Sequence, residues 1–395
     1  MSENRPTPSS DRQPLPVWCG LTIRGWLALL RQRPTIERAF WKRSVAVTAA
    51  SIANSVFGAA ERVVFARRID RTVLAHPPIF ILGHWRSGTT FLHQLLASDP
   101  QFSAPNLYQC SFPEHFLVTE NWLAPMTAWL QPRTRPMDAV RNSWDAPAEE
   151  EIALMLLTFS SPYLVSAFPD APQRAQRFDS LAKGLSPKEL DHWKQAYVRL
   201  LKKLTLGSDK PLVLKSPANT SRVPLLLDLF PNARFIHIVR NPYAVFSSTL
   251  HLHRVLSRDN SFTATAPVDL EERVLSSYLA MYHSYHLYRV KIPAHARYEL
   301  RFEDLEADPV GELRKIYRHL NWSGADQIQE RLAGELAQHR AFRKNTFQLP
   351  EETRRRVAER WEPAFLRYGY PLDGPPPPLI EPVSDQASSS RSRPE

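Results

Sequence analysis

Residues 77–100 read PPIFILGHWRSGTTFLHQLLASDP, and this stretch decides the fold. The apolar run Pro77–Gly83 ends in glycine and predicts a short buried strand. The letters TTFLHQLLASDP then predict a helix that ends near Asp99 and Pro100. Between them, the turn Gly83–Thr90 directs backbone N–H groups and the positive end of the helix toward one point. Such a turn is suited to holding a phosphate or a sulfate.

Strand-like and helix-like runs alternate along the rest of the chain. The strand-like runs are Pro211–Pro217, Ala233–Pro242 and Ala296–Leu305, and the helical runs cover 222–230, 243–254 and 309–320. Alternation of this kind predicts βαβ units that form a parallel sheet with helices on both faces. The predicted fold class is therefore α/β, with three layers around a sheet like that of P-loop proteins.

The remaining segments suggest how the domain is bounded. Residues 1–16 are polar and rich in proline, and 374–395 combine a proline run with Ser and Arg, so both are expected to be disordered. Residues 17–74 are expected to form a helical N-terminal extension. The α/β domain then spans 75–373, and 102–170 form a helical cap inserted on its acceptor side.

The composition limits the class of partner and the cell compartment. The 395 residues include 50 Lys plus Arg against 40 Asp plus Glu, a formal charge of +10, which favours anionic partners. Runs of Lys and Arg typical of nucleic-acid tails are missing, so no nucleic-acid partner is expected. Two cysteines, Cys19 and Cys110, make neither a ligand cluster nor a disulfide framework. They suit a reducing compartment, and the polar start of the chain resembles no secretory signal, so a cytoplasmic protein is expected.

One segment resembles a membrane element. Ser44–Ala60 is uncharged and largely apolar, but it carries Ser, Thr and Asn and is slightly short for a transmembrane span. A buried or interfacial helix is the favoured interpretation. Cations precede and follow the segment, so contact of the N-terminal helices with a membrane surface stays open; they are Lys42, Arg43, Arg62, Arg67 and Arg68.

The turn at Gly83–Thr90 differs from a nucleotide P-loop at one decisive position. The P-loop pattern G-x-x-x-x-G-K-[ST] requires a lysine after the second glycine, and Thr89 stands there instead. The cation is Arg86, two residues before Gly88. Without the lysine the turn is poorly matched to a β/γ-phosphate with Mg²⁺. An ordinary glycine turn capped by Ser or Thr is the bland alternative, which the combination of cation, glycines and strand–helix context disfavours.

The motif R-S-G-T-T after an apolar strand resembles the 5′-phosphosulfate loop of the sulfotransferase superfamily, in bacterial-type members related to the Golgi and tyrosylprotein branch. The resemblance implies that the co-substrate is 3′-phosphoadenylyl sulfate (PAPS) and that no metal is needed. The loop residues would hold its phosphosulfate, and Arg86 would also neutralise charge on the bridging oxygen; they are Arg86, Ser87, Gly88, Thr89 and Thr90.

Three further segments are similar to donor-binding parts of the same family. Arg240 and Ser248, in FPNARFIHIVRNPYAVFSS, match its 3′-phosphate pair. Phe302, in RFEDLEADP, stands where many members have a tyrosine near the adenine, and it lacks the hydroxyl. Arg343 and Lys344 resemble a loop that grips the 3′-phosphate, although Asn345 replaces its glycine. The alternatives are a surface ion pair for Arg240, a core position for Phe302 and solvated loop charges for the last two.

The candidates for catalysis come from the ends of predicted elements. Lys215 ends a strand in VLKSP, where parallel strands face the ligand crevice, and is assigned to stabilising the leaving group; a solvated lysine is the alternative. The resemblance implies that a general base follows the loop by about twenty residues, where this chain has no carboxylate. The nearest groups able to accept a proton are His115, which is favoured, and Glu114. A third option is the run Glu149–Glu151, whose plain interpretation is acidic residues complementing a helix dipole.

These observations predict an enzyme that transfers the sulfuryl group of PAPS to a hydroxyl or an amine by in-line displacement. The acceptor is expected to be a bulky small molecule or lipid, because 102–170 contain Trp122, Trp129 and Trp144; these could equally be core residues of the cap. The alternatives are a P-loop-type kinase or NTPase and a non-catalytic protein of the same fold that binds membrane surfaces.

Overall fold

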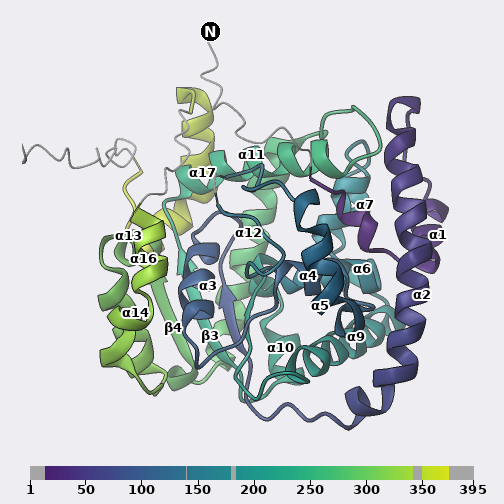
Figure 1. Ribbon diagram of the computed structural model, residues 1–395. Coiled ribbons are helices and arrows are strands. Elements are labelled where there is room, and N and C mark those ends of the chain that lie inside the picture. Colours follow the sequence, from purple (N-terminus) through teal and green to yellow (C-terminus); the bar gives the residue numbers. More distant parts are fainter. Residues whose placement is uncertain (1–13, 139, 179–183, 341–348, 373–395) are drawn as a thin grey trace, which may run out of the picture.

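The computed structural model describes residues 14–138, 140–178, 184–340 and 349–372. Its sheet has four parallel strands in the order β2 (Val213–Lys215), β1 (Ile79–Leu82), β3 (Arg234–Val239) and β4 (Arg297–Arg301). Each strand lies within a run that the sequence predicts. The α/β fold class is thereby confirmed (Figure 1).

Helices surround the sheet and form most of the molecule (Figure 1). They are α1 (Ile23–Arg31), α2 (Trp41–Arg71), α3 (Thr89–Ser98), α4 (Leu107–Ser111), α5 (Phe116–Thr127), α6 (Glu150–Thr158), α7 (Gln173–Gln176), α9 (Pro187–Thr205), α10 (Val223–Leu229), α11 (Pro242–Asn260), α12 (Leu270–Tyr288), α13 (Phe302–Ala307), α14 (Pro309–His319), α15 (Ile328–Arg331), α16 (Ala333–Arg340) and α17 (Glu351–Tyr368). Short 3₁₀ turns include η3 (Ala128–Leu130), η4 (Pro162–Ala167) and η5 (Pro217–Ser221).

The alternation of side chains along β1 explains the three layers. Ile79 and Ile81 face one side, where they belong to a core formed with α3 and α14. Phe80 and Leu82 face the other side and share a core with α6, α9 and α10. All four side chains are buried, so the strand is apolar throughout, as expected for a parallel sheet covered on both faces.

The N-terminal helices are part of the main core. Trp18, Leu29 and Val47 belong to the same buried cluster as Phe80. On the inner side of α2, Asn54 donates hydrogen bonds from Nδ2 to the carbonyls of Cys19 (2.7 Å) and Leu21 (2.9 Å). These contacts hold the long helix along one edge of the molecule (Figure 1). Of the termini expected to be disordered, 1–13 and 374–395 lie outside the described residues.

Local signals set where the site-bearing helix α11 begins. The Asn241 side chain accepts a hydrogen bond from the backbone N–H of Tyr243 at 3.0 Å, which caps the helix. Pro242 occupies the first turn, where its missing N–H costs nothing. The strand β3 therefore ends at Val239, and Arg240 stands at the junction between strand and helix.

Candidate functional site

The loop between β1 and α3 requires glycine at both ends. Gly83 has φ +150°, and a Cβ there would lie 2.5 Å from the carbonyl oxygen of Ile238. Gly88 has φ +97°, and its Cβ would lie 2.2 Å from Cδ2 of Phe302. Only glycine adopts these angles without strain and leaves room for the neighbouring groups. The backbone thus forms a tight cradle at the N-terminus of α3, suited to an anion.

Arg86 lies at the centre of this cradle. It is a non-glycine residue in the left-handed region, with φ +67°, an uncommon conformation that clusters at functional sites. Its Nε donates to Oγ of Ser248 at 2.7 Å, and its carbonyl accepts from Nη1 of Arg240 at 3.3 Å. The structure therefore brings together Arg86, Arg240 and Ser248, which the sequence assigns to two ends of one donor.

Phe302 closes the cradle from beneath. Its ring lies against Gly88, and the Arg240 guanidinium sits 4.5 Å from the ring centroid. A cation over an aromatic face is attractive, and it fixes the orientation of the guanidinium. Burial lowers the pKa of Arg240, and nearby Glu303 offsets part of this shift. Phe302 thus lies among the residues predicted to bind the donor, where the family resemblance implies an aromatic group.

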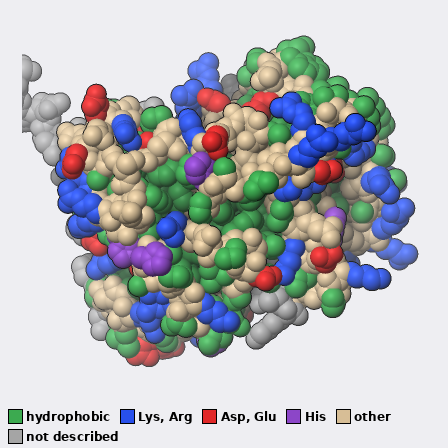
Figure 2. Space-filling model, turned by 90° about the horizontal axis from the view of Figure 1, so that it is seen from below, with side chains coloured by type: hydrophobic (Ala, Val, Ile, Leu, Met, Phe, Trp, Pro, Cys, Tyr) green, Lys and Arg blue, Asp and Glu red, His purple; other side chains and the backbone are tan. Residues whose placement is uncertain are grey.

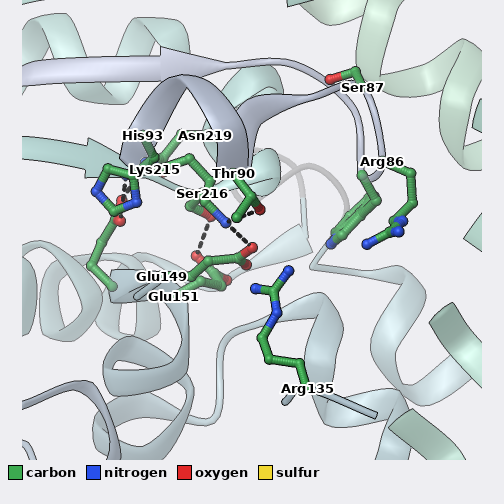
Figure 3. Close-up of polar contacts among 12 residues, drawn as sticks. Arg86, Ser87, Thr90, His93, Arg135, Glu149, Glu151, Lys215, Ser216 and Asn219 are labelled. Carbon is green, nitrogen blue, oxygen red and sulfur yellow. Dashed lines mark hydrogen bonds and ion pairs between the residues drawn. The ribbon is translucent and has the colours of Figure 1, made fainter. Parts of the chain in front are cut away.

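The other loop residues face different directions. Ser87 is buried, and its Oγ donates to the carbonyl of His84 at 2.8 Å, so its hydroxyl stabilises the loop rather than facing Arg86 (Figure 3). Thr89 is buried at the first position of α3. Thr90 points to the opposite side of the cradle, and its Oγ1 accepts a hydrogen bond from Nζ of Lys215 at 3.3 Å.

Lys215 connects the donor loop to a carboxylate. It is the last residue of β2, its side chain is 2% exposed, and its ammonium group forms an ion pair with Glu149 (Figure 3). Burial lowers the pKa of Lys215, and Glu149 counteracts this shift. A lysine buried at the carboxyl end of β2, the strand next to β1, lies beside Thr90, where it could meet charge on a bound sulfate group.

Glu149 sits immediately before α6 and faces the same space. Its side chain is 18% exposed, so the carboxylate stays accessible although Lys215 and Tyr163 contact it. The Tyr163 hydroxyl donates to Glu149 and accepts from Nε1 of Trp85 at 2.8 Å. A chain of hydrogen bonds therefore links the donor loop, through Trp85 and Tyr163, to Glu149.

The next two glutamates serve the scaffold. Glu150 accepts from the Tyr197 hydroxyl (2.9 Å), Asn219 Nδ2 (2.7 Å) and the backbone N–H of Lys215 (3.0 Å). Burial raises the pKa of Glu150 to about 7, although these hydrogen bonds act in the opposite direction. Glu151 forms a buried bidentate pair with Arg222, at 2.5 and 2.8 Å. Together they fix the start of α6, and hence Glu149, against β2.

The two residues predicted first as general base lie elsewhere. His115 is buried between α5 and α2, where its Nδ1 contacts Oγ1 of Thr119 (2.8 Å) and its Nε2 contacts Oδ1 of Asn54 (3.1 Å). Burial lowers its pKa to about 4. Glu114 faces Arg62 of α2 at 3.9 Å. Neither contacts Arg86 or Lys215, so the geometry gives no support to the predicted role, whereas Glu149, from the third option, pairs with Lys215.

Asp138 and Arg135, like Tyr163, were missed by sequence reasoning. Asp138 accepts a hydrogen bond from Nη1 of Arg86 at 2.6 Å and a bidentate pair from Arg135 at 2.7 and 3.0 Å. Burial would raise the pKa of Asp138, but the two guanidinium groups hold it well below its ordinary value. The letters QPRTRPMDAV carry no motif, so the sequence offers no signal for this cluster.

The remaining predicted positions are two cations and three tryptophans. Arg343 and Lys344 lie outside the described residues. In the expected cap, Trp144 packs against Tyr108, with ring centroids 5.4 Å apart, whereas Trp122 and Trp129 are exposed. The tryptophans that suggested an acceptor pocket therefore do not line the site, although 102–170 supply Glu149 and Tyr163 to it.

Apolar side chains border the cradle on the side of Trp85. Trp85, Leu252 and Met281 form a small buried cluster, against which Met137 and Tyr163 pack. A small cavity also opens beside Trp85, and its lining includes Pro162, His253, Val274 and Ser277. Tyr163, which contacts Glu149, also packs against this apolar cluster.

Comparison with known proteins agrees with this geometry. Residues 77–326 match the model of the sulfotransferase family. The omega-hydroxy-beta-dihydromenaquinone-9 sulfotransferases Stf3 of Mycobacterium tuberculosis and Mycobacterium bovis are 38% identical over 369 residues, which cover 93% of this chain and 95% of theirs.

Solved structures share the fold at low sequence identity. The sulfotransferase STF9 from Mycobacterium avium superposes with a TM-score of 0.67 at 16% identity, over 95% of this chain and all of that one. The sulfotransferase STF1 from Mycobacterium tuberculosis gives 0.54 at 16% identity, over 85% and 90% of the two chains. At these identities the structures support the architecture alone.

Proposed function

This chain belongs to the sulfotransferase family and is a PAPS-dependent transferase, and we propose that its acceptor is a lipid-like hydroxyl whose proton is taken by Glu149. One observation carries the proposal: the carboxylate of Glu149 pairs with Lys215 beside Thr90, the last residue of the donor loop. A base and a cation thus stand on the acceptor side of an anion cradle.

The donor side fits PAPS in charge. Gly83 and Gly88 let the loop pack closely against Ile238 and Phe302, which holds the turn at the N-terminus of α3. Arg86 and Lys215 would hold the 5′-phosphosulfate, and Arg240 with Ser248 the 3′-phosphate. Phe302, beneath Arg240, offers an aromatic face close to the donor. Ser87, Gly88, Thr89 and Thr90 contribute the loop backbone and the Thr90 hydroxyl.

The reaction follows as an in-line displacement. Glu149 accepts the proton of the acceptor hydroxyl as that oxygen forms a bond to sulfur. The bond between sulfur and the bridging oxygen breaks, and its electron pair stays on the 5′-phosphate of adenosine 3′,5′-bisphosphate. Lys215 and Arg86 neutralise the charge that builds on that oxygen, a contribution of several kcal/mol in comparable sites, on the order of 3 to 4 kcal/mol per donor.

The lipid-like acceptor is supported by the surroundings of Trp85 and by the 38%-identical relatives named for a menaquinone derivative. The test is an assay of purified protein with PAPS and matched acceptors: a long-chain ω-hydroxy isoprenoid, its amine analogue and a small phenol. Sulfation of the isoprenoid hydroxyl, detected by mass spectrometry, is the expected result. Exclusive sulfation of the phenol or the amine would contradict the proposed acceptor class.

We also propose that this enzyme is cytoplasmic and docks on an acidic membrane surface through the outer face of α2. That face carries apolar residues at helical spacing, and each is more than half exposed; they are Trp41, Val45, Ile52, Val56 and Val63. Between Arg43 and Glu61 the helix has no charged residue, and Glu61 itself is buried in a 2.5 Å pair with Lys203. Exposed apolar faces of this length mark interaction sites.

Neighbouring elements extend the apolar face and supply charge. Trp122 of α5 packs 5.7 Å from the ring of Phe57, and Met126 and Trp129 beside it are 64% exposed. Cations flank the face at both ends of α2; they are Arg38, Lys42, Arg62, Arg67 and Arg68. Seen from below, Lys and Arg side chains gather at the right-hand edge, the side on which α2 lies (Figures 1 and 2).

This combination of apolar ridge and flanking cations matches anionic lipid rather than a neutral surface. In the part of the chain that the structure describes, no helix is long and apolar enough to cross a bilayer. Sedimentation with phosphatidylglycerol vesicles should capture the protein, and phosphatidylcholine vesicles should capture much less.

The matched variants are Val56→Asp, on the proposed face, and Val290→Asp, because Val290 is also exposed but lies after α12. Only Val56→Asp should abolish vesicle binding. If the protein forms a dimer without lipid, and Val56→Asp makes it a monomer, then a second copy covers the face and the membrane proposal is wrong.

A further inference from the structure

Arg135 is a charged residue of the site that the mechanism above leaves without a role. It lies in the segment between η3 and α6, which crosses the acceptor side of the donor loop. Backbone contacts fix its position: Arg135 N–H donates to the carbonyl of Val140 at 2.9 Å, and Asp138 N–H donates to the carbonyl of Arg135 at 3.2 Å. Thr134 and Arg141 form an antiparallel bridge across the same turn. The turn thus holds Arg135 and Asp138 in one geometry.

Asp138 joins Arg135 to the donor-binding arginine. Its Oδ2 accepts from Nη1 of Arg86 at 2.6 Å and from Nη2 of Arg135 at 2.7 Å, and its Oδ1 accepts from Nε of Arg135 at 3.0 Å. The Nε and Nη2 edge of the Arg135 guanidinium, its fork, therefore binds both carboxylate oxygens of Asp138, which fixes the plane of the guanidinium. The Asp138 side chain is only 5% exposed, so little water competes for these bonds.

The guanidinium of Arg135 points into the space between Arg86 and Glu149 (Figure 3). Lys215 borders the same space, since its ammonium group contacts both Glu149 and Thr90. The charge of Arg135 reaches these groups: it adds to the lowering of the Lys215 pKa that burial begins. A group held by the donor loop and attacked from the side of Glu149 would have Arg135 beside it.

We propose that Arg135 is a catalytic cation that binds the equatorial oxygens of the sulfuryl group during transfer, and that Asp138 is the positioning residue that aims it. The inference rests on the proposed function and deepens it. In an in-line displacement the bond from sulfur to the bridging oxygen breaks while the bond to the acceptor oxygen forms, and charge spreads over the oxygens of the transferred group. Arg86 approaches from the donor loop and Lys215 from the end of β2, and Arg135 would complete the set from the segment between η3 and α6.

The product offers a way to separate this role from donor binding. Adenosine 3′,5′-bisphosphate has the phosphates of PAPS but no sulfuryl group. A residue that contacts only the sulfuryl group should affect turnover and leave the affinity for the bisphosphate unchanged. A residue that holds the nucleotide should affect both. The same purified full-length protein serves for both measurements.

Arg135→Ala should lower kcat by roughly 100-fold or more, the usual cost of removing one donor to a transition-state oxygen. Its dissociation constant for adenosine 3′,5′-bisphosphate should stay within about threefold of the parent value. Arg135→Lys keeps the charge but not the fork, and should recover part of the loss. Arg133→Ala removes an exposed arginine two residues away and should leave both quantities unchanged.

Asp138→Asn tests the positioning role, because it should change turnover and bisphosphate affinity in opposite directions, which unfolding cannot do. Loss of the fork should lower kcat by roughly tenfold. Removal of a negative charge 2.6 Å from Arg86 should tighten binding of the bisphosphate. A variant that was merely misfolded would lose both.

Two results would overturn the inference. Full turnover in Arg135→Ala would remove Arg135 from the reaction. Equal losses of kcat and of bisphosphate affinity would assign it to the nucleotide instead of the sulfuryl group. Failure of the parent protein to bind the bisphosphate is a different outcome, because it would contradict the donor assignment on which the inference rests.

Discussion

The donor half and the acceptor half of the site are encoded in different ways. The donor half is built from consecutive residues, Gly83 to Thr90, whose backbone makes the cradle because two glycines permit it. The acceptor half brings Glu149 and Tyr163 from separate turns to Lys215 at the end of a strand. A local motif therefore predicts the anion site, whereas the proposed base meets Lys215 only in the folded chain. The following variants test that division.

The largest effect is expected at Glu149. Glu149→Gln keeps the size of the side chain and removes the base, so kcat should fall by about 10² to 10⁴-fold, the usual worth of a general base. Affinity for adenosine 3′,5′-bisphosphate should change little, because Glu149 faces the acceptor. Steady-state turnover and a binding titration measure the two quantities.

Glu114→Gln is the matched control, since Glu114 contacts Arg62 rather than Lys215. It should retain parent turnover. If Glu114→Gln loses more activity than Glu149→Gln, the base lies where counting along the sequence put it, and the acceptor half has been assigned incorrectly.

Glu150 should give a pH-dependent effect on stability within the same half. Its pKa is raised to about 7 in the folded protein, so between pH 4.5 and 7 the folded chain holds a proton that the unfolded chain has released. The stabilisation is thus complete below about pH 4.5 and is lost as the pH rises through 7, by about 3 kcal/mol in total.

Glu150→Gln has no proton to release and should lack this slope. Urea unfolding between pH 5 and 8 measures the free energy of unfolding of both proteins. The advantage of the parent over Glu150→Gln should narrow or reverse toward pH 8. Parallel curves at all pH values would show that Glu150 is ionised throughout in the folded protein.

In the donor half, Arg86→Ala should weaken binding of adenosine 3′,5′-bisphosphate by roughly 30 to 100-fold. The reason is that a charge-assisted hydrogen bond contributes about 2 to 3 kcal/mol. Calorimetric titration measures the change. Arg62→Ala, an exposed arginine on α2, should bind as the parent does. Unchanged affinity in Arg86→Ala would remove the loop from the donor site.

The smallest effect concerns the shape of the loop. Gly88→Ala introduces a Cβ 2.2 Å from Phe302 at φ +97°, and should cost about 1 to 3 kcal/mol of unfolding free energy. Gly207→Ala, where a Cβ would meet nothing within 4 Å, is the control and should be close to neutral. Equal stabilities would mean that the cradle tolerates a side chain.

The sequence predicted the four strands and the donor loop because each depends on a short run of residues. Pro77–Gly83 is apolar and ends in glycine, and Asn241 with Pro242 marks the end of a strand and the start of a helix. These signals act within a few residues, so no knowledge of the fold is needed to recognise them.

The general base could not be found in this way. A helix dipole is enough to explain acidic residues at 149–151. Nothing in these letters shows that β2 ends beside α6, where Lys215 contacts Glu149. His115 was favoured because its distance from Arg86 was counted along the chain. In the folded protein it bonds to Asn54 and Thr119 instead. Arg135 and Asp138 belong to no motif, and only the fold brings them to Arg86.

The most direct test of the donor assignment is a thermal-shift titration with adenosine 3′,5′-bisphosphate, run beside ATP with Mg²⁺. A ligand that binds only the folded state stabilises it by about 2.7 kcal/mol at a hundredfold excess over Kd. The account predicts this stabilisation with the bisphosphate and none with ATP, because Thr89 replaces the P-loop lysine. Stabilisation by ATP with Mg²⁺ alone would contradict it and would favour a kinase-like site.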